Sequence, residues 1–265
     1  MDYSKLTIPV SFYADVHDNI GQNCELSWLE FGWLLQSYSR DEFPNKESAP
    51  LFSPTRYSGT RDAQHGSTSA LLVIDADHGW KIENVVAALK TDSIESIIYS
   101  TASNRDGSRF RVVVPLAEPI DLPTQRRAVG ALRDYLADCL GLSATGVDQG
   151  KLSPVVLFYV PGKYAGATNE FCHVAGDVLA ADQWIEVFPQ PEPKKPEPRP
   201  ASLNRNVEWN YEACEAVQAY RSRSNGRHAA LYGMMCALVM SAENAGYDLS
   251  ESELADIAAR EQWGN

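Results

Sequence analysis

The segment from Pro189 to Pro200 constrains the fold of this chain most, because neither a helix nor a central strand can run through it. Prolines occupy nearly every second position, where they remove backbone hydrogen-bond donors and favour extended polyproline II structure. At about 3.1 Å per residue, the segment predicts a semi-rigid spacer on the order of 35 Å long. We therefore expect a mixed α and β domain over residues 1–188, a proline-rich linker over residues 189–204 and a helical domain over residues 205–265.

Patterns of strands and helices follow each other in the part before the linker. Strands are expected at residues 8–14, 71–74, 95–99, 110–114 and 155–160, with Pro115 ending the fourth of them. Helices are expected after the capping box that begins at Ser27, over residues 82–89 and over residues 121–140. Behind the linker, residues 211–220, 227–246 and 250–261 are three further predicted helices. The pattern is that of an α+β protein with a small helical C-terminal domain.

One of the predicted strands ends in two carboxylates. The apolar run Ala70–Ile74 is typical of a buried strand and leads directly into Asp75-Ala76-Asp77. Residues i and i+2 of a strand share a face, so the carboxylates of Asp75 and Asp77 are expected side by side. Such a pair either shares a proton or holds a cation, and oxygen ligands suit Mg²⁺ or Mn²⁺. The alternative is that the two aspartates begin a turn.

Two further segments carry polar groups of the kind that bind phosphates or metals. The strand end Ser100-Thr101-Ala102-Ser103-Asn104 offers hydroxyl and amide groups, and Arg109 and Arg111 share a face of the next strand. Asp148 lies in a glycine-flanked loop. Each segment alone is also compatible with an ordinary hairpin or turn. Together, three carboxylates and two arginines describe a site for nucleotidyl transfer, in which the carboxylates hold two metal ions and the arginines hold a triphosphate.

These motifs resemble those of the archaeo-eukaryotic primase superfamily, specifically the primase-polymerases of bacteriophages and plasmids. That family combines an apolar strand ending in Asp-x-Asp, a hydroxyl-rich strand end with a histidine ahead of an arginine-rich strand, and an apolar-Asp motif. The corresponding segments here are Ile74-Asp75-Ala76-Asp77, Ser100–Asn104 with Arg109-Phe110-Arg111, and Val147-Asp148. Segments 54–61 and 158–162 are similar as well, so the resemblance covers about residues 8–187.

The resemblance implies a fold and a set of roles. The fold is a primase-polymerase core, with an RRM-like catalytic sheet and an N-terminal α/β module. By this resemblance, Asp75, Asp77 and Asp148 bind Mg²⁺ or Mn²⁺. Nucleotide binding falls to the following residues: Ser103, Arg109, Arg111, Asn104 in the place of the family histidine, and Arg61. Because an asparagine cannot become cationic, this replacement implies weaker triphosphate binding, a changed pH dependence or an inactive site.

The implied function is template-directed nucleotidyl transfer by a DNA primase or DNA polymerase in phage or plasmid replication. The implied partners are a single-stranded DNA template with its primer and dNTP or NTP substrates, and a replicative helicase domain or protein is a further candidate. Two alternatives stay open. One is a catalytically inactive replication-initiator or DNA-binding module of the same fold, and the other is a metal-dependent nuclease.

Composition limits these functions in two ways. The net charge of −12 argues against a protein that coats nucleic acid non-specifically, although it allows one local basic groove. No apolar stretch approaches the roughly 20 residues that span a bilayer, and the N-terminal residues lack a signal-peptide pattern. The five cysteines are scattered and form no metal-binding pair. We expect a reduced cytoplasmic protein without a membrane partner, in the bacterial host if the chain is phage-encoded.

Overall fold

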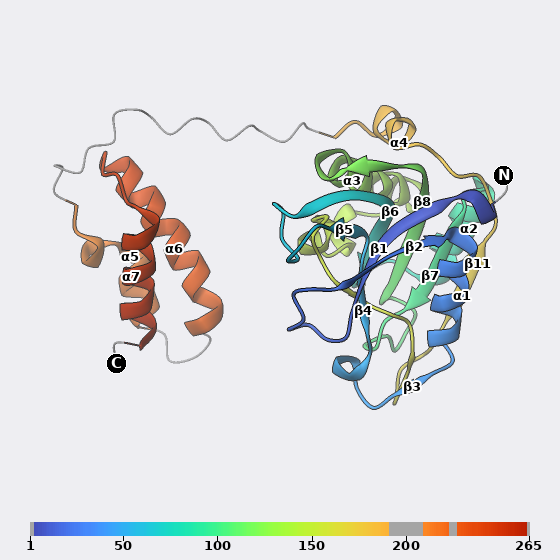
Figure 1. The fold of residues 1–265 in the computed structure, drawn as a ribbon, viewed down its shortest axis with the longest axis horizontal. Helices are drawn as coiled ribbons and strands as arrows, with labels where there is room; N and C mark the ends of the chain where they lie inside the picture. Colours follow the sequence, from blue (N-terminus) through green and yellow to red (C-terminus); the bar gives the residue numbers. More distant parts are fainter. Residues whose placement is uncertain (1–2, 191–208, 223–226, 264–265) are drawn as a thin grey trace. The chain divides into compact units, whose positions relative to one another are not determined.

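A computed structural model of the 265-residue chain describes residues 3–190, 209–222 and 227–263. The chain divides into two compact units, residues 1–193 and 194–265 (Figure 1). Most of the linker predicted over residues 189–204 lies outside the described residues, as do Asn225 and Gly226 ahead of the second helix of the tail. The two units are therefore described one by one.

Two antiparallel sheets build the first unit. The five-stranded sheet has the order β11-β7-β8-β6-β5, and the four-stranded sheet has the order β2-β1-β4-β9. The strands of the larger sheet are β5 (Thr55–Tyr57), β6 (Gly66–Ala76), β7 (Ser96–Ser100), β8 (Phe110–Asp121) and β11 (Phe171–Val174). Those of the smaller sheet are β1 (Thr7–Tyr13), β2 (Gln22–Ser27), β4 (Leu51–Ser53) and β9 (Phe158–Tyr159). A parallel pair of two-residue strands, β3 (Glu42–Phe43) and β10 (Lys163–Tyr164), lies apart from both.

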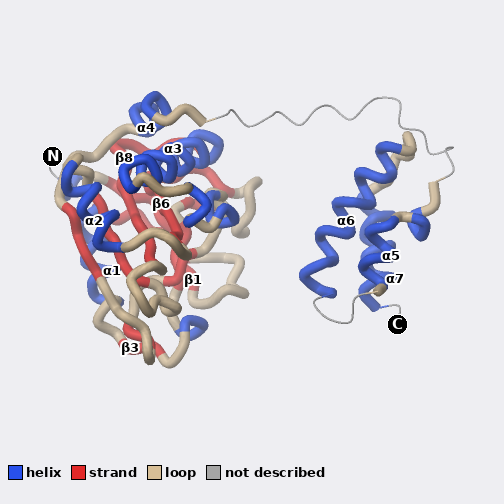
Figure 2. The backbone as a smooth tube through the Cα atoms, turned by 180° about the vertical axis from the view of Figure 1, so that it is seen from behind, coloured by secondary structure: helices blue, strands red, loops and turns tan. Residues whose placement is uncertain are grey.

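The central strands are apolar on both faces because both faces are covered. Along β6, Leu72 and Ile74 belong to the core under the helices α2 (Ile82–Thr91), α3 (Leu122–Leu140) and α4 (Ala181–Val187). The alternate residues Leu71 and Val73 belong to the core shared with the four-stranded sheet and α1 (Trp28–Tyr38). Figures 1 and 2 show this layered arrangement. By the same alternation, Asp75, the last odd-numbered residue of β6, faces away from the layer that α2, α3 and α4 form.

The helix ends follow the local sequence. Ser27 caps α1 in a capping box with Glu30, as predicted. The side chain of Asp121 caps α3, and Gly141 ends that helix in the left-handed conformation with a φ of 61°. These contacts fix where α1 begins and where α3 begins and ends.

Two strand predictions differ from the structure. Strand β8 does not stop at Pro115 but continues to Asp121. Pro115 lies beside an irregularity in the pairing of β6 with β8 and beyond the residues that pair with β7, and a strand tolerates a missing donor at such a place. Of the strand expected over residues 155–160, only Phe158 and Tyr159 are paired, because their partner β4 is itself only three residues long.

The second unit is a small helical unit with its own core. Its helices are α5 (Glu215–Arg221), α6 (Arg227–Asn244) and α7 (Glu251–Trp263). Val217, Leu238 and Leu249 are among the buried residues that hold them together. Ser250 and Glu253 form the capping box of α7. The α+β class and the three helices of the tail are thus present, while the finer arrangement implied by the family resemblance stays a prediction.

Candidate nucleotide-binding and metal-binding site

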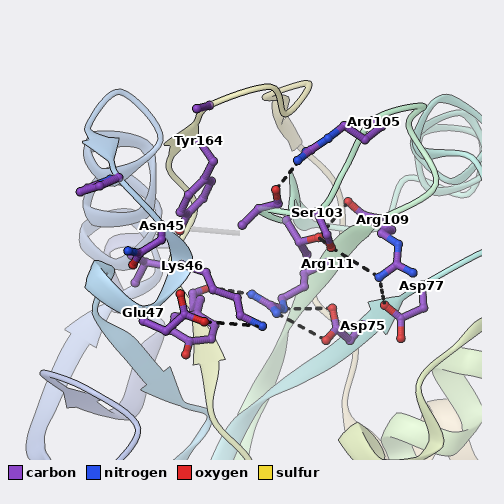
Figure 3. A pocket seen from close by; sticks show the side chains of 16 residues that line it. Asn45, Lys46, Glu47, Asp75, Asp77, Ser103, Arg105, Arg109, Arg111 and Tyr164 are labelled. Atoms are coloured by element: carbon purple, nitrogen blue, oxygen red, sulfur yellow. Dashed lines mark hydrogen bonds and ion pairs between the residues drawn. The ribbon is translucent and has the colours of Figure 1, made fainter.

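A pocket of about 510 Å³ opens at the end of the five-stranded sheet where β6 ends and β8 begins (Figure 3). Its size is in the range of small-molecule sites. One wall is the turn 44–47, and another is the loop after β7 with residues 101–103 and Arg105. The remaining lining comes from Tyr159, Val160, Tyr164 and Ala165, and from the charged ends of β6 and β8.

Strand pairing sets two carboxylates beside two arginines in this pocket. Asp75 is the direct cross-strand partner of Arg111 in the antiparallel pair β6–β8. The next positions on the same face bring Asp77 to Arg109, with 3.5 Å between Asp77 Oδ1 and Arg109 Nη1. The two aspartates and the two arginines therefore lie together, in two acid–base pairs, at this end of the sheet. Acids and bases alternate on this surface and partly neutralise each other.

The inner pair is buried and closely bonded. Arg111 Nε lies 3.1 Å from Asp75 Oδ1, and Nη2 lies 3.4 Å from Oδ2. The side chains of Arg111 and Asp75 are only 8% and 9% exposed. Burial is the largest influence and by itself would lower the pKa of Arg111, but the charge of Asp75, together with Tyr99 and the hydrogen bonds to both, raises that pKa above its usual value. Arg111 therefore stays charged in its buried position.

The outer pair is open to solvent and loosely held. The side chains of Arg109 and Asp77 are 44% and 39% exposed. Among the described residues, Arg109 Nη1 has one further partner besides Asp77, the hydroxyl of Ser103 at 3.4 Å. Arg109 is consequently free to turn toward an anion that enters the pocket.

Asp148 joins the same edge through its backbone. Val147 forms an antiparallel bridge with Ala76, and the amide of Asp148 donates to the carbonyl of Asp75 at 3.0 Å. This pairing puts Asp148 across from Asp75 on β6, on the side opposite β8. Its carboxylate, however, turns back and accepts a hydrogen bond from the Gly150 amide at 2.9 Å. In the described part of the chain, no three acidic, histidine or cysteine side chains converge closely enough to form a metal site.

The donor set nevertheless fits a hard divalent cation in part. Asp75 and Asp77 present carboxylate oxygens on one face of the pocket, and oxygen is the ligand type that Mg²⁺ and Mn²⁺ prefer. Asp148 would complete the set only after its carboxylate leaves the turn that it caps. The two aspartates at the end of β6 are thus the candidate ligands, and Asp148 is a conditional third.

Asn104 differs from the expectation that it would face a nucleotide. The residue is fully buried and does not line the pocket. Its side-chain oxygen accepts from the amides of Gly107 at 3.0 Å and Arg109 at 3.3 Å, and its amide nitrogen donates to the Thr168 carbonyl at 2.9 Å. The side chain therefore holds together the loop that carries Ser103, Arg105 and Arg109.

Arg61 also lies away from the pocket. Its Nη1 is 3.4 Å from the Val155 carbonyl, and its guanidinium lies 5.8 Å from the centre of the Tyr13 ring. The pocket instead contains charged residues that sequence reasoning missed, namely Lys46, Glu47 and Arg105. Arg105 lies two residues after Ser103 in the same polar loop, and this position is a signal that identifies it as a candidate phosphate ligand. Lys46 lies in a one-turn helix, Lys46–Ser48, for which no sequence pattern gives a signal.

Tyr164 is a further pocket residue that the sequence did not indicate. It borders the pocket, is 7% exposed, and its ring stacks on Phe43 at 5.8 Å. Its buried hydroxyl has no hydrogen-bond partner among the described residues. Burial raises the pKa of this phenol to about 12. Tyr164, whose ring stacks on Phe43, forms an aromatic wall on the side of the pocket that lies across from Asp77 and Arg109 (Figure 3).

Comparison with known proteins gives structural neighbours only. No protein-family model matches the chain, and no curated protein matches it. The primase-polymerase domain of cyanophage S-2L is 10% identical, with a TM-score of 0.42 over 69% of this chain and 90% of that domain. The polymerase domain of Mycobacterium tuberculosis Ligase D, solved with DNA, is 13% identical, with a TM-score of 0.31 over 70% of this chain and 82% of that one. Primase RepB′ is 11% identical, with a TM-score of 0.33 over 97% and 88%.

The chain is similar to primase and polymerase domains. No helix within residues 3–190, 209–222 and 227–263 has the length and apolar character needed to cross a membrane. All five cysteines are free thiols.

Proposed function

We propose that residues 1–188 form a nucleotidyl transferase that makes or extends primers on a single-stranded DNA template. One observation carries the proposal: a single sheet surface at the mouth of a 510 Å³ pocket presents Asp75 and Asp77 beside Arg111 and Arg109. Carboxylates beside arginines are what the transfer of a nucleotide from a triphosphate needs, because the reaction brings a cation and a polyanion into one small volume.

The residues divide the work as follows. Asp75 and Asp77 would hold Mg²⁺ or Mn²⁺, with Asp148 as the third ligand. Bound at this place, the metal would activate the attacking 3′ hydroxyl and stabilise the leaving pyrophosphate. Arg109, Arg105 and Ser103 would bind the phosphates of the dNTP or NTP and so orient its α-phosphate toward the primer end. The acidic chain would meet nucleic acid at this local set of cations and not over its whole surface.

A primer-extension assay with single-stranded template tests the proposal. Asp77→Asn is the variant of choice, because Asp77 is exposed and its loss should not unfold the protein. Asp75→Ala is a poor choice, because it leaves Arg111 buried without a counter-charge, which typically costs about 3–5 kcal/mol of stability. Asp138→Asn, an exposed change on α3, is the matched control.

We expect the wild-type protein and Asp138→Asn to extend a primer with Mg²⁺ or Mn²⁺, and Asp77→Asn to be at least 100-fold slower at the same thermal midpoint. Full extension by Asp77→Asn would refute the assignment. Separate reactions with dNTP and NTP, with and without a primer, would show the preferred sugar and whether synthesis begins unaided. Shortening of a labelled strand without nucleotides would favour the nuclease alternative.

A binding module without catalysis is the second candidate function. The observation that favours it is the state of the three carboxylates, each of which already accepts a hydrogen bond from the protein. If these bonds persist, the pocket would bind a phosphate group through Arg109 without holding a metal. Calorimetry with dATP separates the two functions, since a transferase should bind nucleotide more tightly when Mn²⁺ is present and the module should not.

A further inference from the structure

Arg111 is the most constrained cation of the pocket. Besides its two bonds to Asp75, its Nη1 donates to the Tyr159 carbonyl at 2.7 Å. The guanidinium also lies 5.4 Å from the centre of the Phe158 ring and 5.9 Å from that of Tyr99. These partners belong to both sheets: Asp75 lies on β6 and Tyr99 on β7 of the five-stranded sheet, and Phe158 and Tyr159 form β9 of the four-stranded sheet. Arg111 therefore joins the two sheets at the point where they meet the pocket.

Moving Arg111 onto a triphosphate would break all of these contacts at once. It would leave Asp75 buried without its counter-charge and the Tyr159 carbonyl without a donor, and both losses are unfavourable. Arg109 loses little by the same movement, because its contacts are 3.4 and 3.5 Å long and its side chain is 44% exposed. Arg111 on β8 and Arg109, the residue just before this strand, therefore differ in how freely their side chains can move.

We infer that Arg111 is a positioning residue for Asp75, and that it is not the phosphate ligand that the sequence resemblance implies. The inference rests on the proposed function and refines it, because it assigns phosphate binding to Arg109 and metal orientation to Arg111. Each oxygen of a carboxylate can accept more than one bond. Arg111 occupies one position on each oxygen of Asp75 and holds the plane of the carboxylate, while the remaining lone pairs stay available to a cation.

The loss of a positioning residue changes the affinity of the site for the metal ion. Groups that hydrogen-bond to metal ligands fix the orientation of those ligands, and their loss typically weakens metal binding by about 10–100-fold. A phosphate ligand acts differently, since its loss weakens nucleotide binding and leaves the affinity for the metal alone unchanged. The two roles can therefore be separated by measuring Mn²⁺ and nucleotide binding independently.

The experiment compares Arg111→Lys with Arg109→Lys in the full-length chain. Both changes keep the positive charge and remove the planar fork, so they are matched in chemistry. Mn²⁺ binding is measured by calorimetry without nucleotide, dATP binding is measured at saturating Mn²⁺, and the thermal midpoint is recorded for each protein. Arg111→Gln serves as a second variant that removes the charge.

We expect Arg111→Lys to weaken Mn²⁺ binding at least tenfold and Arg109→Lys to change it less than twofold. Arg109→Lys should in turn weaken dATP binding by roughly tenfold. A lower thermal midpoint of Arg111→Lys with unchanged Mn²⁺ affinity would show a merely structural role and overturn the inference, as would unchanged Mn²⁺ affinity in Arg111→Gln. If the wild-type protein binds neither Mn²⁺ nor dATP, the proposed function fails and the inference fails with it.

Discussion

Replacing Asn104 by alanine should destabilise the loop that carries Ser103, Arg105 and Arg109, although Asn104 itself does not line the pocket. The variant removes one acceptor and one donor from a fully buried position. Three backbone groups then lose their partner: the amides of Gly107 and Arg109, bonded at 3.0 and 3.3 Å, and the Thr168 carbonyl, bonded at 2.9 Å. The orientation of the side-chain amide follows from these partners, because its oxygen meets two donors and its nitrogen meets an acceptor.

The magnitude follows from these three bonds. A buried polar group without a partner costs about 1–3 kcal/mol, and the space left by the side chain allows some of the groups to bind water. We therefore take about 1 kcal/mol for each group and expect a total loss near 3 kcal/mol. For a domain of about 190 residues this corresponds to a fall in the thermal midpoint of roughly 6–12 °C.

The assay is calorimetric unfolding, with nucleotide binding measured on the same samples. Asn84→Ala, an exposed change on α2, is the control and should shift stability by less than about 0.5 kcal/mol. Asn104→His should be destabilised as well, because it puts a larger ring at a fully buried position. Nucleotide affinity should fall together with stability, since the loop carries Arg109.

One result would refute this reasoning. If Asn104→Ala unfolds at the wild-type temperature and yet fails to bind dATP, then Asn104 contacts the nucleotide directly, as its place in the family motif implies. The measured pair of stability and affinity therefore decides between a structural asparagine and a ligand-binding one.

Three further outcomes follow from the aromatic wall and the buried phenols. Tyr164→Phe should leave the thermal midpoint unchanged or raise it, because the hydroxyl has no partner to lose; a clear fall in calorimetry would contradict this. Gly162→Ala should cost about 1–3 kcal/mol in chemical denaturation, since a Cβ would overlap the Phe43 ring. Burial raises the pKa of Tyr13, Tyr99 and Tyr164 to about 12 each, so the folded state holds these protons more tightly than the unfolded chain does. The stability that these phenols contribute should therefore be full below about pH 10 and should fall as the pH rises toward 12. Chemical denaturation at pH 8, 10 and 11 would measure this fall.

Local patterns predicted the elements that carry the site. The apolar run before Asp75, the capping box at Ser27 and the helix ended by Gly141 all lie where the residues alone place them. The prediction of α+β structure and of helices in the tail rests on the same short-range signals. The predicted end of β8 at Pro115 was wrong because the sequence alone does not show how this strand pairs. The pairing of β8 with β6 shows that Pro115 lies at an irregularity, where a missing donor is tolerated.

What the sequence could not supply is the register between distant strands. The i, i+2 rule places Asp75 with Asp77 and Arg111 with Arg109, but it does not say which acid faces which base. That choice depends on how β6 and β8 align across the 33 residues, 77–109, that separate them, which no local pattern encodes. For the same reason the burial of Asn104 was invisible, because Thr168 reaches it from a segment 64 residues away.

The alternation of charge on this face bears on how a polyanion would approach an acidic protein. The chain carries a net charge of −12, yet the pocket holds four cationic side chains against three acidic ones, and two of the acids are paired with arginines. A surface with interleaved signs attracts neither a bare triphosphate nor a free cation strongly. A complex of both is complementary to it, because its cation faces the carboxylates while its phosphates face Arg109 and Arg105. Nucleotide and metal should accordingly bind with positive coupling, each tightening the other by the same factor, and this coupling should be weaker in Arg109→Lys than in the wild-type protein.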